Sequence, residues 1–152
     1  MDKYRQALQG VAQVLSKRIS DGTTVGLGSG STVAAIIEEL SPLVIAKSKH
    51  IDGVPTSTQI EMVASRNGFA LVPFTGSVDF VIDGADQVDA GLNLVKGGGG
   101  ALLREKVIMS SAKDVNIVAT EEKFSKRLCE KGVRVPIEVV PIARESAKLK
   151  LS

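Results

Sequence analysis

A glycine-rich segment near the start of the chain has the composition of a loop that binds an anion. Residues 26–32 read Gly-Leu-Gly-Ser-Gly-Ser-Thr and lie between a β-rich run and a helical pattern. Glycines let backbone N–H groups approach an anion closely, and the hydroxyls of Ser29, Ser31 and Thr32 add donors at the start of the helix. The segment is a candidate phosphate site, and a tight turn with a serine cap is the alternative.

Two nucleotide-binding patterns can be compared with this loop. The ATP-type loop requires a lysine that residues 26–32 do not contain. The dinucleotide pattern G-x-G-x-x-G is nearly met by Gly26 and Gly28, and Asp52 falls where an acid that binds ribose would stand. Ser31 occupies the third glycine position, however, and a serine does not allow the close packing of helix and strand that glycine allows. Three hydroxyls favour a terminal phosphate monoester over a nicotinamide dinucleotide.

Three aspartates at three-residue spacing follow an apolar run, at Asp83, Asp86 and Asp89. Acids at the end of a strand could hydrogen-bond sugar hydroxyls or bind Mg²⁺. For Asp89 we favour a turn in which the side chain caps the loop backbone. For Asp83 and Asp86 together we favour a ligand site, because two neighbouring acids repel each other without a ligand or cation. Dedicated divalent sites usually have more oxygen ligands at tighter spacing.

A second glycine run follows Lys96 and leads into a helical pattern that contains Glu105. Four successive glycines, residues 97–100, indicate a ligand approached by bare backbone, and Lys96 adds a mobile positive charge. Glu105 lies on a partly apolar stripe of the helix. Its carboxylate either pairs with Arg104 or Lys106 or points into the cleft, where burial would raise its pKa toward the range of a general base. Taken alone, Glu105 fits an ordinary surface residue better.

The elements that must position these segments alternate between strands and helices. Apolar spacing predicts helices over residues 4–19, from 31 to just before Pro42, and over 56–67, 101–112, 121–131 and from 144. The predicted strands are 23–27, a strand end and turn at 50–54, then 69–72, 80–82, 93–95 and 115–119, with 133–140 extended. The apolar face of the first helix comprises Tyr4, Ala7, Leu8, Val11, Val14 and Leu15.

This alternation predicts a single α/β domain over residues 1–152, with a doubly wound, Rossmann-like, mostly parallel sheet and helices on both faces. The nearly continuous apolar run at 115–119 is typical of a buried parallel strand. Each glycine-rich or aspartate-rich motif follows a predicted strand. Ligands of such sheets bind at the carboxyl ends of the strands, so we expect all the motifs to face one cleft.

Composition excludes several other classes of protein. The 152 residues carry 19 basic and 17 acidic side chains, interspersed, and only 3% aromatics, which gives no case for nucleic acid. The single Cys129 cannot form an internal disulfide, and the single His50 cannot build a histidine-based metal site. No apolar run approaches the roughly 18 residues of a membrane span, and the N-terminus is charged. We expect a cytoplasmic protein that does not bind a membrane.

Six motifs, in order and in spacing, resemble ribose-5-phosphate isomerase of type A. They are residues 26–32, Gly53-Val54-Pro55-Thr56-Ser57, Asp83-Gly84-Ala85-Asp86, Lys96-Gly97-Gly98-Gly99, Arg104-Glu105-Lys106 and Pro136-Ile137-Glu138-Val139. The resemblance implies interconversion of D-ribose 5-phosphate and D-ribulose 5-phosphate through an enediolate, in the non-oxidative pentose phosphate pathway, without cofactor or metal. It also implies a homodimer or homotetramer whose partner is a small-molecule sugar phosphate.

The resemblance carries roles onto matching positions. Glu105 looks like the general base. The matching substrate contacts are Ser29, Gly30, Ser31, Thr32, Asp83, Gly84, Ala85, Asp86, Lys96, Gly97, Gly98, Gly99 and Lys123. Residues 29–32 look like the anion loop, residues 83–86 like the sugar-hydroxyl site, and Lys96 with the glycines after it like the groups that steady negative charge.

The sequence also departs from the family pattern. Gln87 stands where the family commonly has an acid, and Ser29 replaces a frequent threonine. The family chain continues into a small lid and then returns to the core domain, whereas this sequence stops at Ser152, about where the extension begins. We therefore expect the lid and the returning elements to be missing. The alternative function is a catalytically weak or inactive module of the same fold that binds a sugar phosphate.

Overall fold

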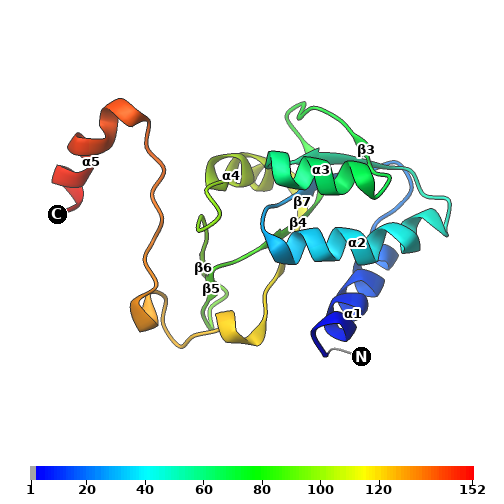
Figure 1. Ribbon diagram of the computed structural model, residues 1–152, viewed down its shortest axis with the longest axis horizontal. Helices are drawn as coiled ribbons and strands as arrows, with labels where there is room; N and C mark the ends of the chain where they lie inside the picture. Colours follow the sequence, from blue (N-terminus) through cyan, green and yellow to red (C-terminus); the bar gives the residue numbers. More distant parts are fainter. Residues whose placement is uncertain (1–2) are drawn as a thin grey trace.

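A five-stranded parallel sheet forms the centre of the molecule (Figure 1), as seen in a computed structural model that describes residues 3–152. The strand order is β3-β2-β1-β4-β7. The strands are β1 (Thr23–Leu27), β2 (Ile51–Pro55), β3 (Ala70–Leu71), β4 (Val78–Gly84) and β7 (Ala112–Val118). A short antiparallel pair, β5 (Gln87–Val88) and β6 (Leu94–Val95), follows β4.

Helices cover both faces of this sheet. The helices are α1 (Lys3–Arg18), α2 (Ser31–Ile45), α3 (Thr58–Arg66) and α4 (Leu102–Ser110). Apolar residues of α1, α2 and α3 form one core cluster with Leu27 and Ile82, whereas Ile108 of α4 packs with Val54 and Val81 in a second cluster. Side chains alternate between the faces of a strand, so Ile82 and Val81 serve opposite layers. The predicted fold class is confirmed.

The register of the sheet brings three chain segments to one edge. Leu27 of β1 is aligned with Pro55 of β2 and with Ile82 of β4. Because the strands are parallel, the residues that follow them must lie side by side. The Gly28, Thr56 and Asp83 positions are therefore neighbours, although they are far apart in the sequence.

Several boundaries differ from those that the sequence predicts; α3, for example, begins at Thr58 rather than at residue 56. Helix α2 continues through Pro42 to Ile45. Pro42 has no N–H to donate to the carbonyl of Glu38, but Glu38 is exposed and water can take the place of that donor. Helix α4 ends at Ser110, and Ala112 already belongs to β7. The parallel strand expected at 115–119 is present as β7, but β7 lies at the edge of the described sheet and is only partly buried, so the expected burial is wrong.

The helix expected over residues 121–131 is also wrong. This segment contains two short 3₁₀ turns, η1 (Glu121–Lys123) and η2 (Glu130–Gly132). Contacts with the β5 segment replace helical hydrogen bonds: Ser125 donates its N–H to the carbonyl of Val88 at 2.9 Å, and Cys129 donates its N–H to the side chain of Gln87. Cys129 has a left-handed φ of 64°, which ends any helix there.

The last part of the chain extends away from the sheet (Figure 1). Residues 133–140 contain no helix or strand, as expected, and lead into a 3₁₀ turn, η3 (Pro141–Ala143), and the helix α5 (Arg144–Leu151). One hydrogen bond attaches this arm near α4, from the N–H of Leu103 to Glu138 Oε2 at 3.0 Å. Across residues 3–152, none of the helices has both the length and the apolar character of a membrane span.

Candidate active site

Two buried carboxylates share one ammonium group at the centre of the candidate site. Lys96 Nζ lies 3.0 Å from Asp83 Oδ2 and 3.2 Å from Glu105 Oε2. Its nitrogen also donates to the carbonyl of Gly84 at 2.5 Å. Asp83 is 1% exposed and Glu105 is 5% exposed. The surface interpretation of Glu105 is therefore wrong: the first turn of α4 directs this side chain inward, toward Lys96.

The carboxylate of Asp83 is buried between a positive and a negative side chain, those of Lys96 and Glu105. Its Oδ1 accepts the N–H of Gly84 at 2.6 Å, but no donor among residues 3–152 makes a well-aligned hydrogen bond to its Oδ2. The contact with Lys96 is therefore an ion pair by distance rather than a directed bond. Burial raises the pKa of Asp83 above its ordinary value, the charge of Lys96 opposes this shift, and the charge of Glu105 adds to it.

Gly28 is required by the position of Asp83. A Cβ atom at residue 28 would lie 2.1 Å from Asp83 Oδ1, which is far inside van der Waals contact. The N–H of Gly28 donates to the carbonyl of Ile82 at 2.8 Å, so the loop after β1 lies directly against the end of β4. This close approach accounts for a glycine immediately after β1.

The second glycine run folds over the acidic turn. Asp86 Oδ2 accepts the N–H of Gly98 at 2.8 Å, and a Cβ atom at residue 98 would lie 2.9 Å from Asp86 Oδ1. Gly97 has a φ of 110°, a conformation that side chains rarely adopt. Together these contacts hold the backbone that follows Lys96 in a single arrangement. Asp89, in contrast, accepts the N–H groups of Gly91 and Asn93, so it caps a loop as expected.

The first glycine loop leads into an uncapped helix. The N-cap of α2 is Gly30, with a φ of 94°, and no side chain caps the first turn. A serine cap is therefore not the role of this loop. The first N–H groups of α2, which include those of Ser31 and Thr32, have no hydrogen-bond acceptor among the described residues. Free N–H groups and the positive end of the helix dipole together suit an anion.

One cleft of about 330 Å³ brings these parts together. Every residue matched to a substrate contact or to the base lines it: Ser29, Gly30, Ser31, Thr32, Asp83, Gly84, Ala85, Asp86, Lys96, Gly97, Gly98, Gly99, Glu105 and Lys123. Sequence reasoning missed three further lining residues, Tyr4, Thr120 and Glu122. The last two adjoin Lys123 in η1 and could have been included on that ground. Tyr4 belongs to the apolar face predicted for the first helix but is 43% exposed. Of that predicted face, α1 buries Leu8 and Leu15, and it also buries Ala12.

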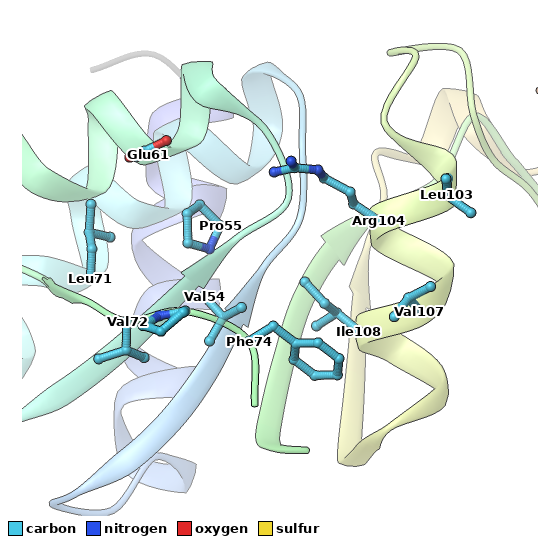
Figure 2. A pocket seen from close by; sticks show the side chains of 11 residues that line it. Val54, Pro55, Glu61, Leu71, Val72, Phe74, Leu103, Arg104, Val107 and Ile108 are labelled. Carbon is cyan, nitrogen blue, oxygen red and sulfur yellow. The ribbon is translucent and has the colours of Figure 1, made fainter. Parts of the chain in front are cut away.

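A larger cavity of about 640 Å³ lies elsewhere and has a different character. Figure 2 shows Arg104, Val107 and Ile108 of α4 on one side of it and Val54 and Leu71 on the other. Its lining is mainly apolar and contains none of the residues of the smaller cleft. Size alone would select this cavity, but the converging charges and free donors are in the smaller cleft. Nowhere in residues 3–152 do three or more His, Cys, Asp or Glu side chains form a cluster suited to a metal.

Comparison with known proteins places this arrangement in a family. The family model of ribose 5-phosphate isomerase A (phosphoriboisomerase A) matches residues 52–152. The chain belongs to that family. Ribose-5-phosphate isomerase A of Korarchaeum cryptofilum (strain OPF8) is 44% identical over 132 residues, which cover 86% of this chain and 57% of that relative. The chain thus spans a little over half the length of this relative.

Solved structures of ribose 5-phosphate isomerases share the fold. The enzyme from Methanocaldococcus jannaschii superimposes with a TM-score of 0.88 at 35% identity, over 96% of this chain and 66% of that one. A D-ribose-5-phosphate isomerase in complex with phospho-erythronic acid gives a TM-score of 0.87 at 36% identity, over 96% of this chain and 65% of its own. The family resemblance read from the six motifs is confirmed.

Proposed function

We propose that the cleft interconverts D-ribose 5-phosphate and D-ribulose 5-phosphate. The observation that carries this proposal is the buried contact between Glu105 and Lys96, at 3.2 Å, in a cleft that also contains the uncapped start of α2. A carboxylate beside an ammonium group can move a carbon-bound proton while the neighbouring charge stabilises the resulting oxyanion. Family membership supports the same reaction.

The reaction can be written with one carboxylate. In the open-chain aldose, Glu105 removes the proton from C2, and the C–H electrons form a C1–C2 double bond while the carbonyl oxygen on C1 becomes an oxyanion. The proton of the C2 hydroxyl then moves to the oxygen on C1. Finally Glu105 returns its proton to C1, and the C2 oxygen becomes the carbonyl of the ketose. Atoms and charge balance without a cofactor.

Positive charge and N–H donors must lie near the enediolate oxygens. Lys96 has this position relative to Glu105, and the backbone of Gly97, Gly98 and Gly99 lines the same cleft. Asp83 and Asp86 line it as well, and their carboxylates are suited to accept hydrogen bonds from sugar hydroxyls. We assign the acidic turn to recognition of the sugar and Lys96 to stabilisation of the oxyanion.

The phosphate group belongs at the anion loop. Residues 29–32 offer hydroxyls and free N–H groups, and Lys123 adds a cationic side chain in the same cleft. Phosphate is remote from C1 and C2, so its binding energy would position the reacting carbons rather than take part in the chemistry. A cytoplasmic location and a homodimer or homotetramer complete the proposal, and light scattering measures the second of these.

One experiment tests the reaction itself. Ribose 5-phosphate in deuterated water should exchange its C2 proton in the presence of the chain, as followed by proton NMR, while ribulose 5-phosphate accumulates. A thermal shift with ribose 5-phosphate provides the parallel measure of binding. Binding without exchange would refute the isomerase proposal and support the alternative, a module that holds a sugar phosphate without turnover.

A further inference from the structure

Thr56 is a buried hydroxyl residue to which the proposed reaction gives no role. It directly follows β2 and is 3% exposed. Its backbone N–H donates to the carbonyl of Leu27 at 2.9 Å, which fixes residue 56 against the end of β1. It does not line the cleft that contains Ser29; it lines a neighbouring pocket, which shares Gly99 with that cleft.

The side chain of Thr56 reaches the anion loop from behind. Its Oγ1 lies 2.7 Å from Ser29 Oγ, at hydrogen-bond distance. Within residues 3–152, neither of these two hydroxyls has another hydrogen-bond partner. Ser29 itself lines the cleft. The two residues come from neighbouring strand ends and are 27 positions apart in the sequence. A buried hydroxyl keeps a partner wherever it can, so this pair is a fixed feature of the loop.

The direction of this hydrogen bond decides what Ser29 can do. A hydroxyl has one hydrogen to donate and two lone pairs that accept. If Ser29 donates to Thr56, only the lone pairs of Ser29 remain available to the cleft, and they repel an anion. If Thr56 donates to Ser29, the hydrogen of Ser29 is free for the anion, and the bond it receives strengthens it as a donor. The Thr56 hydroxyl keeps its partner in both cases, so an anion can select the second arrangement at little cost.

We propose that Thr56 is a positioning residue that makes Ser29 a hydrogen-bond donor to the phosphate of the substrate. This inference rests on the proposed function for the identity of the anion. Thr56 acts through Ser29, which in turn contacts the ligand. The expected signature is a loss of affinity for phosphorylated ligands that depends on the presence of the Ser29 hydroxyl.

The test uses substitutions at residue 56 and a matched control. Thr56→Val removes the hydroxyl and keeps the branched shape, whereas Thr56→Ser keeps the hydroxyl. Thr58→Val makes the same change two residues later, at an exposed side chain outside the cleft. We expect Thr56→Val to weaken binding of ribose 5-phosphate and of inorganic phosphate by roughly threefold to tenfold, measured by calorimetry, since a bond to a charged group is weakened but not removed. Thr56→Ser and Thr58→Val should bind within about twofold of the unaltered chain.

A double-mutant cycle separates this role from a merely structural one. In the Ser29→Ala background, Thr56→Val should cause no further loss of affinity, because the hydroxyl through which it acts is absent. Additive losses would overturn the proposal, as would an unchanged affinity in Thr56→Val. Should Thr56→Val fail to fold, Thr56→Cys keeps the volume with a weaker donor and takes its place in the cycle.

Turnover distinguishes this proposal from the proposed function. If the unaltered chain binds ribose 5-phosphate but does not exchange its C2 proton, the isomerase proposal fails while the cycle still decides the role of Thr56. If turnover is normal, Thr56→Val should raise KM with kcat within about twofold, since phosphate binding is shared by ground and transition states. If neither ribose 5-phosphate nor inorganic phosphate binds, both proposals are overturned.

Discussion

Replacement of Glu105 by glutamine tests the proposed chemistry most directly. Glutamine keeps the shape of glutamate but cannot accept a carbon-bound proton. A positioned general base contributes about 10²–10⁴-fold to the rate, or about 2.7–5.5 kcal/mol of transition-state stabilisation. We expect kcat of Glu105→Gln to fall by at least about 10²-fold. The affinity for ribose 5-phosphate should stay close to that of the unaltered chain.

The structure indicates that this variant should remain folded. Breaking a buried ion pair is usually costly because it leaves one charge without a partner. Here two carboxylates share Lys96, so removing the charge of Glu105 leaves Lys96 paired with Asp83 at 3.0 Å and bonded to the carbonyl of Gly84. Loss of the Glu105 charge also removes one cause of the raised pKa of Asp83, so that pKa should move down. The melting temperature should therefore change little.

The assay is exchange of the C2 proton with deuterium, combined with kcat and KM for ribose 5-phosphate. Glu61→Gln is the matched control, because Glu61 also lies in the first turn of a nine-residue helix but does not line the cleft. This control should turn over at the rate of the unaltered chain. If Glu105→Gln keeps near-normal exchange, another residue is the base and the mechanism above is wrong.

Three further predictions concern binding, pH and metal. Gly30 has a φ of 94° and open space around the position that a Cβ atom would take, so Gly30→Val should strain the loop without unfolding the chain. The thermal shift produced by ribose 5-phosphate should then be abolished, and a retained shift would contradict the assignment of phosphate binding to this loop. Because burial raises the pKa of Asp83, its protonated form stabilises the fold, and the free energy of unfolding from this group should fall as the pH rises from its ordinary pKa of 3.8 through its higher folded value. Asp83→Asn should remove that fall in urea titrations carried out at successive pH values above 3.8, and an unchanged slope would assign the fall to other groups. EDTA should leave isomerase activity unchanged; activity lost to EDTA and restored by Mg²⁺ would refute the metal-free mechanism.

The sequence was sufficient to predict which residues line the candidate site, because its motifs are local and their order follows the strands. Residues 23–27 form β1 as predicted, and the glycine loop, the acidic turn and the Lys96 segment each follow a strand. Because β1 and β4 are parallel strands of one sheet, the glycine loop and the acidic turn that follow them had to lie side by side. The Lys96 segment follows β6, and the antiparallel pairing of β6 with β5 brings it to the same cleft. The family could be recognised for the same reason, since the spacing of its motifs follows the spacing of its strands.

Only the tertiary structure decided which way particular side chains face. The spacing of Glu105 was compatible with a surface position, and the nearby Lys96, nine residues earlier, directs it inward. Tertiary contacts also decided the conformation of the segment after Glu121. There, hydrogen bonds to Gln87 and Val88 replace the helix that local spacing predicted. The Thr56–Ser29 hydrogen bond joins two strand ends and leaves no periodic signal in the sequence. Local pattern specifies an element, but the partner of a side chain depends on the packing of elements that are distant in the chain.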